Sequence, residues 1–230
     1  MAEDYEASGV LDRVAQDHRV IAFDRPGFGF SQRPRQKIWS AAAQAALLQN
    51  ALEQLGVEEA VVVGHSWGTL VALSMALDFP HRVSALVLLS GYYFPTPRAD
   101  VALSSWPSVP IVGDLLRYTV APLLGWLMAS PVMKALFAPA TVPDAFKASF
   151  PLALALRPSQ IRASAADTAL MIPGAAASAH RHQELTMPIV IMGGEGDKIV
   201  STKRQSEKLH AGIPHSDFRE VRGAGHMIHH

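Results

Sequence analysis

The pentapeptide GHSWG at residues 64–68 constrains this chain most, because it lies where a strand must turn abruptly into a helix. The apolar run Ala60–Val63 predicts a buried strand, and Leu70–Leu77 predicts a helix. Such a turn lifts Ser66 above the sheet edge in a strained conformation, and a glycine two residues to either side relieves the crowding. Ser66 is therefore a candidate nucleophile, and the alternative is a serine that caps the helix.

The remaining chain repeats this alternation of short apolar runs and helical patterns. Because strands separated by helices need crossover connections, the pattern predicts an α/β fold with a mostly parallel sheet flanked by helices. The further strands are predicted at Val20–Phe23, Ala85–Leu89, Pro188–Met192 and Phe218–Val221, and the further helices at Trp39–Leu55 and Thr202–Leu209.

Residues 91–186 break the alternation and hold eleven of the sixteen prolines. The segment is too apolar for a disordered linker, so we expect a helical lid inserted into a core formed by residues 1–90 and 187–230. Its helical pieces are predicted at Ile111–Leu127, Val132–Phe137 and Ser164–Met171. Eight apolar side chains are candidates to line a substrate pocket, although such residues more often form the lid's own core: Leu103, Trp106, Leu116, Tyr118, Leu124, Trp126, Met128 and Phe137.

Two further chemical groups follow later strands. Asp197 closes the loop GGEGD after the fourth predicted strand, and His226 closes GAGH after the fifth. A serine needs a base, and the base needs an acid that orients it, so Ser66, Asp197 and His226 form a candidate catalytic set. Glu195 is the rival acid, and Asp197 could instead serve the turn alone.

Composition excludes several other classes. Twenty basic residues balance twenty acidic ones, so net charge gives no reason to expect nucleic acid or an anionic membrane as partner. The chain has no cysteine, which excludes thiol nucleophiles, disulfides and zinc-thiolate sites but does not indicate a compartment. It has no leader-like start and no run of ~18 apolar residues, so we expect a cytoplasmic protein with no membrane span. Spacing argues against a dinucleotide site and against a metal cluster of His226, His229 and His230, so no cofactor is expected.

Four motifs together, DRPGFGFS at residues 24–31, GHSWG, GGEGD and GAGHM, resemble the α/β-hydrolase superfamily, in its AB hydrolase-1 group. The resemblance implies a serine hydrolase that acts on an ester or similar carbonyl compound through an acyl-enzyme, and the apolar side chains of the lid predict an apolar group on that substrate. The backbone N–H of Trp67 would be an oxyanion-hole donor. Haloalkane dehalogenases and epoxide hydrolases of this superfamily carry aspartate where Ser66 stands, which favours the serine branch.

The chain also departs from the family pattern. The first strands, the loop that gives the second oxyanion donor and the closing helix are not found, so the sequence resembles a fragment. Losing one such donor lowers kcat by about 10²–10³. A truncated or non-catalytic protein that serves as a binding module is therefore the alternative function. The same three residues would also suit perhydrolysis or carbon–carbon bond hydrolysis, and the sequence does not separate these reactions.

Overall fold

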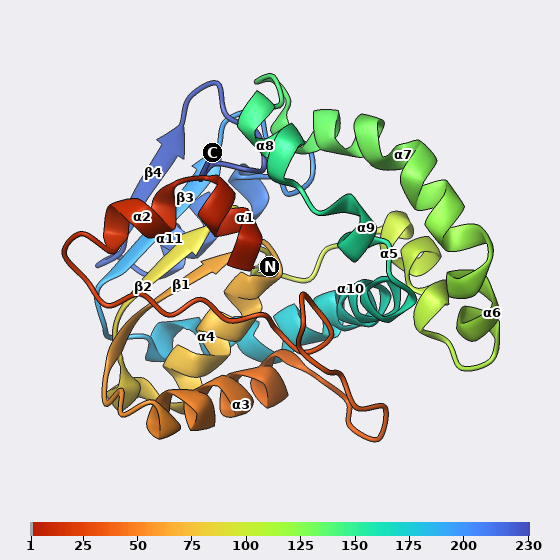
Figure 1. Ribbon diagram of the computed structural model, residues 1–230. Helices are drawn as coiled ribbons and strands as arrows, with labels where there is room; N and C mark the ends of the chain where they lie inside the picture. The colour runs from red at the N-terminus through yellow and green to blue at the C-terminus, as the bar shows by residue number, and fades with distance from the viewer. Residues whose placement is uncertain (1) are drawn as a thin grey trace.

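The sheet of the computed structural model, which describes residues 2–230, has four strands in the order β1-β2-β3-β4 (Figure 1). Each neighbouring pair is parallel. The strands are β1 (Ala60–His65), β2 (Val83–Leu89), β3 (Ile189–Gly194) and β4 (Asp217–Val221). The predicted α/β class is therefore confirmed, and the carboxyl ends of all four strands meet at one edge.

One predicted strand is wrong. Val20–Phe23 is extended chain that pairs with no strand among the described residues. Its apolar pattern has another cause, since Ile21 and Phe23 pack partly buried against the main core. A strand needs a neighbouring strand to pair its backbone hydrogen-bonding groups. Val20–Phe23 has no such neighbour in the described part of the chain, and β1 is therefore an edge strand of the sheet.

The core helices follow the predicted ranges closely. Ser40 caps α3 (Ala41–Gln54) by accepting a hydrogen bond from the backbone N–H of Ala43, and Gly56 lies in the left-handed region just beyond its end. The remaining core elements are α1 (Ala2–Ala7), α2 (Val10–Val14), α4 (Gly68–Asp78), the 3-10 turn η1 (Pro80–Arg82), the π-helical turn η4 (Lys203–Glu207) and α11 (Lys208–Gly212).

The main hydrophobic core lies around α4. Every residue from Thr69 to Leu77 is buried, and α4 packs on β1 and β2 while α3 packs against α4. Leu86, Leu88 and Ile191 of the central strands complete this core. Because α4 is packed on all sides, it cannot shift easily, and the turn that precedes it is held in a fixed position.

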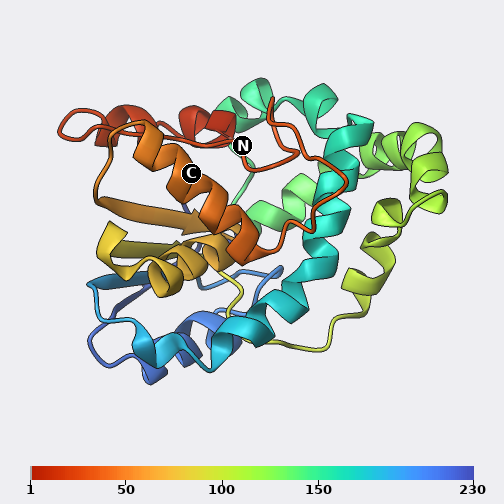
Figure 2. The same cartoon turned by 90° about the horizontal axis from the view of Figure 1, so that it is seen from below.

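Residues 91–186, all of them described, form helices joined by loops and contain no strand. Figure 1 shows the first helices as an arch beside the sheet, and Figures 1 and 2 show α10 running back toward the core. The elements are α5 (Ala99–Ser104), η2 (Trp106–Ser108), α6 (Val112–Tyr118), α7 (Val120–Phe137), α8 (Asp144–Ser149), α9 (Leu152–Ala155), α10 (Pro158–Ala179) and η3 (His182–Glu184). The piece predicted at Ile111–Leu127 is divided between α6 and the first part of α7. Helix α7 then continues through Pro131 and includes the second predicted piece, Val132–Phe137.

The expectation that the lid's large apolar side chains enclose a pocket is wrong. Six of the eight are exposed, namely Leu103, Trp106, Tyr118, Leu124, Trp126 and Met128. Leu116 is half-buried, and Phe137 is buried against Phe146 in a small second core. In α7 the cause is that small residues turn toward the protein and large ones away from it. In α6 Gly113 and Arg117 are buried and Tyr118 is exposed.

Candidate active site

Ser66 occupies the turn between β1 and α4, with a φ of 53° that an L-residue seldom adopts. Backbone hydrogen bonds hold this conformation, because Ser66 N–H donates to Leu89 O on β2 and Ser66 O accepts from the N–H and the hydroxyl of Thr69. The residue is half-buried, so its hydroxyl is held firmly yet remains accessible. Trp67, rather than Ser66, is the N-cap residue of α4.

The two glycines of the pentapeptide have different roles. A Cβ on Gly64 would lie 2.8 Å from Gly68 O, and 2.9 Å from both the Ala72 Cβ and the Thr69 Cα. This crowding explains the glycine before the serine. At Gly68, by contrast, an added Cβ meets nothing within 4 Å among the described residues. The steric reason that the sequence suggested is thus right for Gly64 and wrong for Gly68.

The structure brings Ser66, His226 and Asp197 together. His226 Nε2 lies 2.8 Å from Ser66 Oγ, and His226 Nδ1 lies 2.8 Å from Asp197 Oδ2. The Asp197 and His226 side chains are 1% and 3% exposed, so water is largely excluded from the pair. With the ring in the Nδ1–H tautomer, Nδ1 donates to Asp197 and Nε2 accepts the serine proton.

The second oxygen of Asp197 has a separate task. Asp197 Oδ1 accepts hydrogen bonds from the backbone N–H groups of Ile199 and Val200, at 2.8 and 2.9 Å. One carboxylate thus stabilises its own turn and contacts His226, so the turn and catalytic interpretations of this residue are compatible. The rival acid Glu195 points elsewhere, since its Oε2 accepts from the N–H of Gly223 at 3.0 Å.

Glycines also allow the two loops that carry Asp197 and His226 to approach. A Cβ on Gly194 would collide with the carbonyl oxygen of Gly225, and a Cβ on Gly225 would collide with the carbonyl oxygen of Ala138. The lid contributes directly, because Leu136 O at the end of α7 accepts a hydrogen bond from the N–H of His226 at 2.8 Å. The position of the histidine therefore depends on both the core and the lid.

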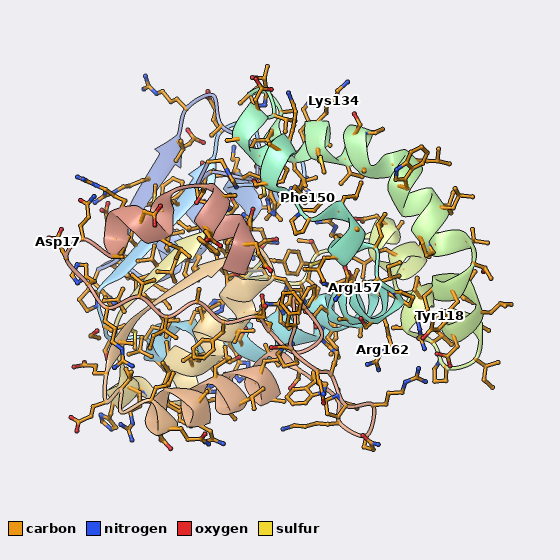
Figure 3. All side chains as sticks on the ribbon, viewed as in Figure 1. Asp17, Tyr118, Lys134, Phe150, Arg157 and Arg162 are labelled. Atoms are coloured by element: carbon orange, nitrogen blue, oxygen red, sulfur yellow. The ribbon has the colours of Figure 1, made fainter. Side chains whose placement is uncertain are left out.

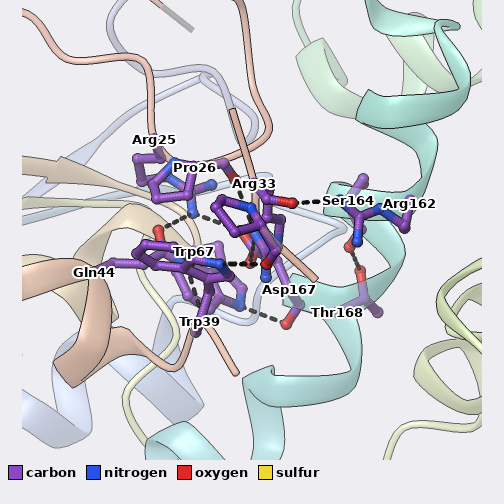
Figure 4. Close-up of polar contacts among 11 residues, drawn as sticks. Arg25, Pro26, Arg33, Trp39, Gln44, Trp67, Arg162, Ser164, Asp167 and Thr168 are labelled. Atoms are coloured by element: carbon purple, nitrogen blue, oxygen red, sulfur yellow. Dashed lines mark hydrogen bonds and ion pairs between the residues drawn. The ribbon is translucent and has the colours of Figure 1, made fainter. Parts of the chain in front are cut away.

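A buried charge network that the sequence did not reveal lies beside the nucleophile turn (Figure 4). Asp167 on α10 is 3% exposed and binds both Arg25, at 2.5 Å, and Arg33, at 2.8 Å. Gln44 of α3 joins Arg25 and Asp167. The Trp67 indole N–H donates to Asp167 O at 2.7 Å, and the Arg25 guanidinium lies 4.6 Å from the Trp67 ring centroid.

A faint signal of this network is present in the sequence. Asp167 is the one charged residue of the predicted helical piece Ser164–Met171, and Arg25 belongs to the motif DRPGFGFS. The sequence around either residue does not indicate that the two side chains pair, because they lie 142 positions apart along the chain. The network was therefore beyond what local patterns could predict.

The chain's ends meet in a group of residues that could hold a metal ion. Asp4, His229 and His230 place ligand atoms within 4.8 Å of one another. His226 is not a member, since its ring faces Ser66 and Asp197. Burial raises the pKa of Asp4, but hydrogen bonds and charge from His229 and His230 outweigh it and lower the pKa to about 2. The His65 ring packs edge-on against His229, and burial lowers the pKa of His65 to about 3.

His182 is buried. Neither ring nitrogen has a hydrogen-bond partner among the described residues, and the ring packs edge-on against Phe94. Burial, with a smaller contribution from the charge of His180, lowers the pKa of His182 to about 4. This ring stays neutral near pH 7 and behaves as a packing residue.

A parallel sheet whose edge presents a strained serine, a histidine and a buried carboxylate is the architecture of the hydrolase-type α/β proteins. The family model described as "alpha/beta hydrolase fold" matches residues 4–230. The chain belongs to this family.

Relatives and solved structures agree with this family. A 2-hydroxy-6-oxo-2,4-heptadienoate hydrolase of Pseudomonas putida is 34% identical over 112 residues, which are 47% of this chain and 41% of that protein. The uncharacterized hydrolase YugF of Bacillus subtilis is 30% identical over 230 residues, covering 95% of this chain and 77% of YugF. An esterase from Exiguobacterium antarcticum has a TM-score of 0.74 at 18% identity, over 98% of this chain and 80% of its own. This last likeness shows the fold alone.

Proposed function

We propose that this chain is a serine hydrolase that cleaves an ester or similar carbonyl compound through an acyl-enzyme. The observation that carries the proposal is the chain of two 2.8 Å hydrogen bonds from Ser66 through His226 to Asp197. In this mechanism Ser66 Oγ attacks the carbonyl carbon while His226 Nε2 accepts its proton. Asp197 holds the ring by Nδ1–H and stabilises its charged form.

Stabilisation of the oxyanion falls to the start of α4. The Trp67 N–H has no hydrogen-bond partner among the described residues and directly follows the nucleophile, where this fold places one oxyanion donor. The helix N-terminus adds a favourable potential for negative charge. His226 then protonates the leaving group and activates a water molecule, which releases the acid and restores Ser66.

The substrate is a small molecule in this proposal. Hydrolysis is also the activity in the names of the Pseudomonas putida relative, which acts on a dienoate, and of YugF. An apolar substituent stays a prediction from the lid's composition, because the exposed lid side chains form no enclosed pocket in the described chain.

Labelling with a fluorophosphonate tests the proposal. We expect one stoichiometric adduct on the peptide that contains Ser66, located by mass spectrometry. Ser66→Ala should abolish the adduct, and Ser90→Ala, which removes a buried serine at the same sheet edge, should leave it unchanged. A folded protein that takes no label on Ser66 would refute the enzyme and favour the non-catalytic binding module.

A further inference from the structure

The helix α7 has its large apolar side chains on the exposed side, whereas a surface helix usually turns them toward the protein core. Its small residues Ala121, Gly125 and Ala129 turn toward the protein, and Leu156 Cδ2 fills the space that a Cβ on Gly125 would need. Of its 18 residues, all of them described, Phe137 alone is buried. The exposed side follows helical spacing and carries large apolar side chains: Val120, Leu123, Leu124, Leu127 and Met128.

The preceding helix repeats this reversal. Gly113 and Arg117 of α6 are buried, whereas Leu115 and Tyr118 are 67% and 69% exposed. Two tryptophans are also exposed, Trp106 on η2 and Trp126 on α7, and Trp126 is 63% exposed. An exposed apolar surface that carries tryptophan and tyrosine at its margin matches the side chains that settle at a membrane–water interface. We call this surface, formed by η2, α6 and α7, the lid surface.

Few charges interrupt the lid surface. Between residues 101 and 142 the charged residues are Asp114, Arg117 and Lys134, and the first two form an ion pair with each other. Asp114 also binds Arg35 at 3.0 Å, so two cations share one carboxylate. Lys134 stays exposed near the end of α7. The excess charge at the lid surface is therefore positive, although the whole chain is neutral.

A positively charged cavity adjoins the lid surface. It has a volume of about 340 Å³ and is lined by Arg33, Arg157, Arg162 and Ser159 among others. Arg157 directly follows Leu156, the residue that packs on Gly125 of α7, so the cavity lies close to that helix. Figure 3 shows Arg157 and Arg162 on the side of the lid where Tyr118 lies. Such a cavity suits a phosphate group, which arginine binds through several hydrogen bonds.

We propose that the lid surface docks on an anionic phospholipid bilayer, with the apolar side chains of α6 and α7 in the interface and the arginine-lined cavity at a lipid phosphate. By length and composition alone α7 could cross a membrane, with a mean hydropathy of 1.5. We place it on the bilayer because Gly125 is packed against α9 and Phe137 is buried against Phe146. Both contacts would break if the helix crossed.

The charge of the lid surface also favours lipid over a second copy of this chain. In a symmetric dimer the same patch meets itself, so Lys134 of the lid surface and Arg157 and Arg162 of the adjoining cavity would come close to the cations of the second copy, which opposes association. An anionic membrane instead attracts each of these cations. The equal numbers of basic and acidic residues gave no reason to expect this attraction. A chain of zero net charge can still carry a locally positive surface, and that local charge is what a membrane attracts.

Co-sedimentation of the full chain with lipid vesicles tests the proposal. We expect binding to vesicles of phosphatidylcholine with phosphatidylglycerol, a blue shift of tryptophan fluorescence, and weakening as salt is added. The double variant Leu123→Asp/Leu127→Asp should bind at least tenfold more weakly, because two apolar contacts are replaced by charges that the lipid repels. Arg157→Gln and Lys134→Gln should each weaken binding about fivefold.

Leu47→Asp on α3 is the matched control, since Leu47 is also exposed but lies outside the lid. We expect its binding and its urea midpoint to match those of the parent chain. Absence of binding, or equal binding to phosphatidylcholine alone, would overturn the proposal. It would also be overturned if the chain forms a dimer that Leu123→Asp/Leu127→Asp dissociates while vesicles bind neither form.

Discussion

The substitution Asp197→Asn tests the candidate catalytic set most sharply, because the structure dictates how the new amide must lie. Asp197 Oδ1 accepts two backbone hydrogen bonds, from Ile199 and Val200. The asparagine oxygen must take that place, which turns its NH₂ group toward His226 Nδ1. The ring is then forced into the Nε2–H tautomer, and Nε2 can no longer accept the proton of Ser66.

The alternative amide orientation restores the tautomer but leaves two backbone N–H groups facing an NH₂. Each unsatisfied donor costs about 1–3 kcal/mol, so the productive orientation lies about 2–6 kcal/mol higher in free energy. That difference corresponds to a loss of about 30-fold to 10⁴-fold in kcat. We expect kcat for a p-nitrophenyl ester to fall within this interval, with KM little changed.

Glu195→Gln is the matched control for this substitution. Its amide oxygen can still accept the N–H of Gly223, so kcat should stay within about threefold of the parent value. The reasoning would be refuted if Asp197→Asn kept kcat within about threefold, or if both variants lost the same activity. Circular dichroism of each variant checks that the fold is retained.

Three further predictions concern stability. Gly64→Ala should lower the free energy of unfolding by about 1–3 kcal/mol, while Gly68→Ala changes it by less than about 0.5 kcal/mol, and equal urea midpoints would contradict the steric argument. Burial lowers the pKa of His182 to about 4 in the folded chain, whereas the unfolded chain keeps the ordinary value of 6.5. Between pH 6.5 and pH 4 the unfolded chain therefore binds a proton that the folded chain does not, so the free energy of unfolding falls as the pH is lowered. His182→Phe should therefore recover about 2 kcal/mol at pH 5 relative to pH 8 in urea titrations, and an unchanged pH dependence would refute this assignment. Asp167→Ala leaves Arg33 buried without its carboxylate and should cost about 3–5 kcal/mol in the same assay, whereas a loss below about 1 kcal/mol would contradict a buried pair.

Local patterns sufficed for the four strands of the sheet and for α3 and α4, because each has a strong period and a clear end. They also identified Ser66, Asp197 and His226 as residues that follow strands, and parallel strands bring such residues to one edge. Their catalytic roles stay predictions. Val20–Phe23 was mistaken for a strand because an apolar run reports burial and not the presence of a pairing partner.

The lid was harder to predict for a different reason. Its composition indicated helices, and the structure has them, but composition does not say which side of a helix faces inward. In α7 the small residues face the protein, so the large side chains of Leu124, Trp126 and Met128 became exposed instead of enclosing a pocket. The contacts of Asp167 depend on residues far away along the chain, which no local pattern reports.

The attachment of α10 to the reactive centre limits how this protein could be redesigned. The Asp167 carboxylate on α10 pairs with Arg25, and the Asp167 carbonyl oxygen accepts a hydrogen bond from the Trp67 indole next to Ser66. Any shift of α10 would therefore move the residues around the nucleophile. The segment from α5 to α9 carries no comparable anchor to the serine-bearing turn among the described residues. Its surface could therefore be exchanged between homologues, provided that Leu136 keeps its carbonyl bond to His226. Grafts that include α10 would need the partner arginines as well.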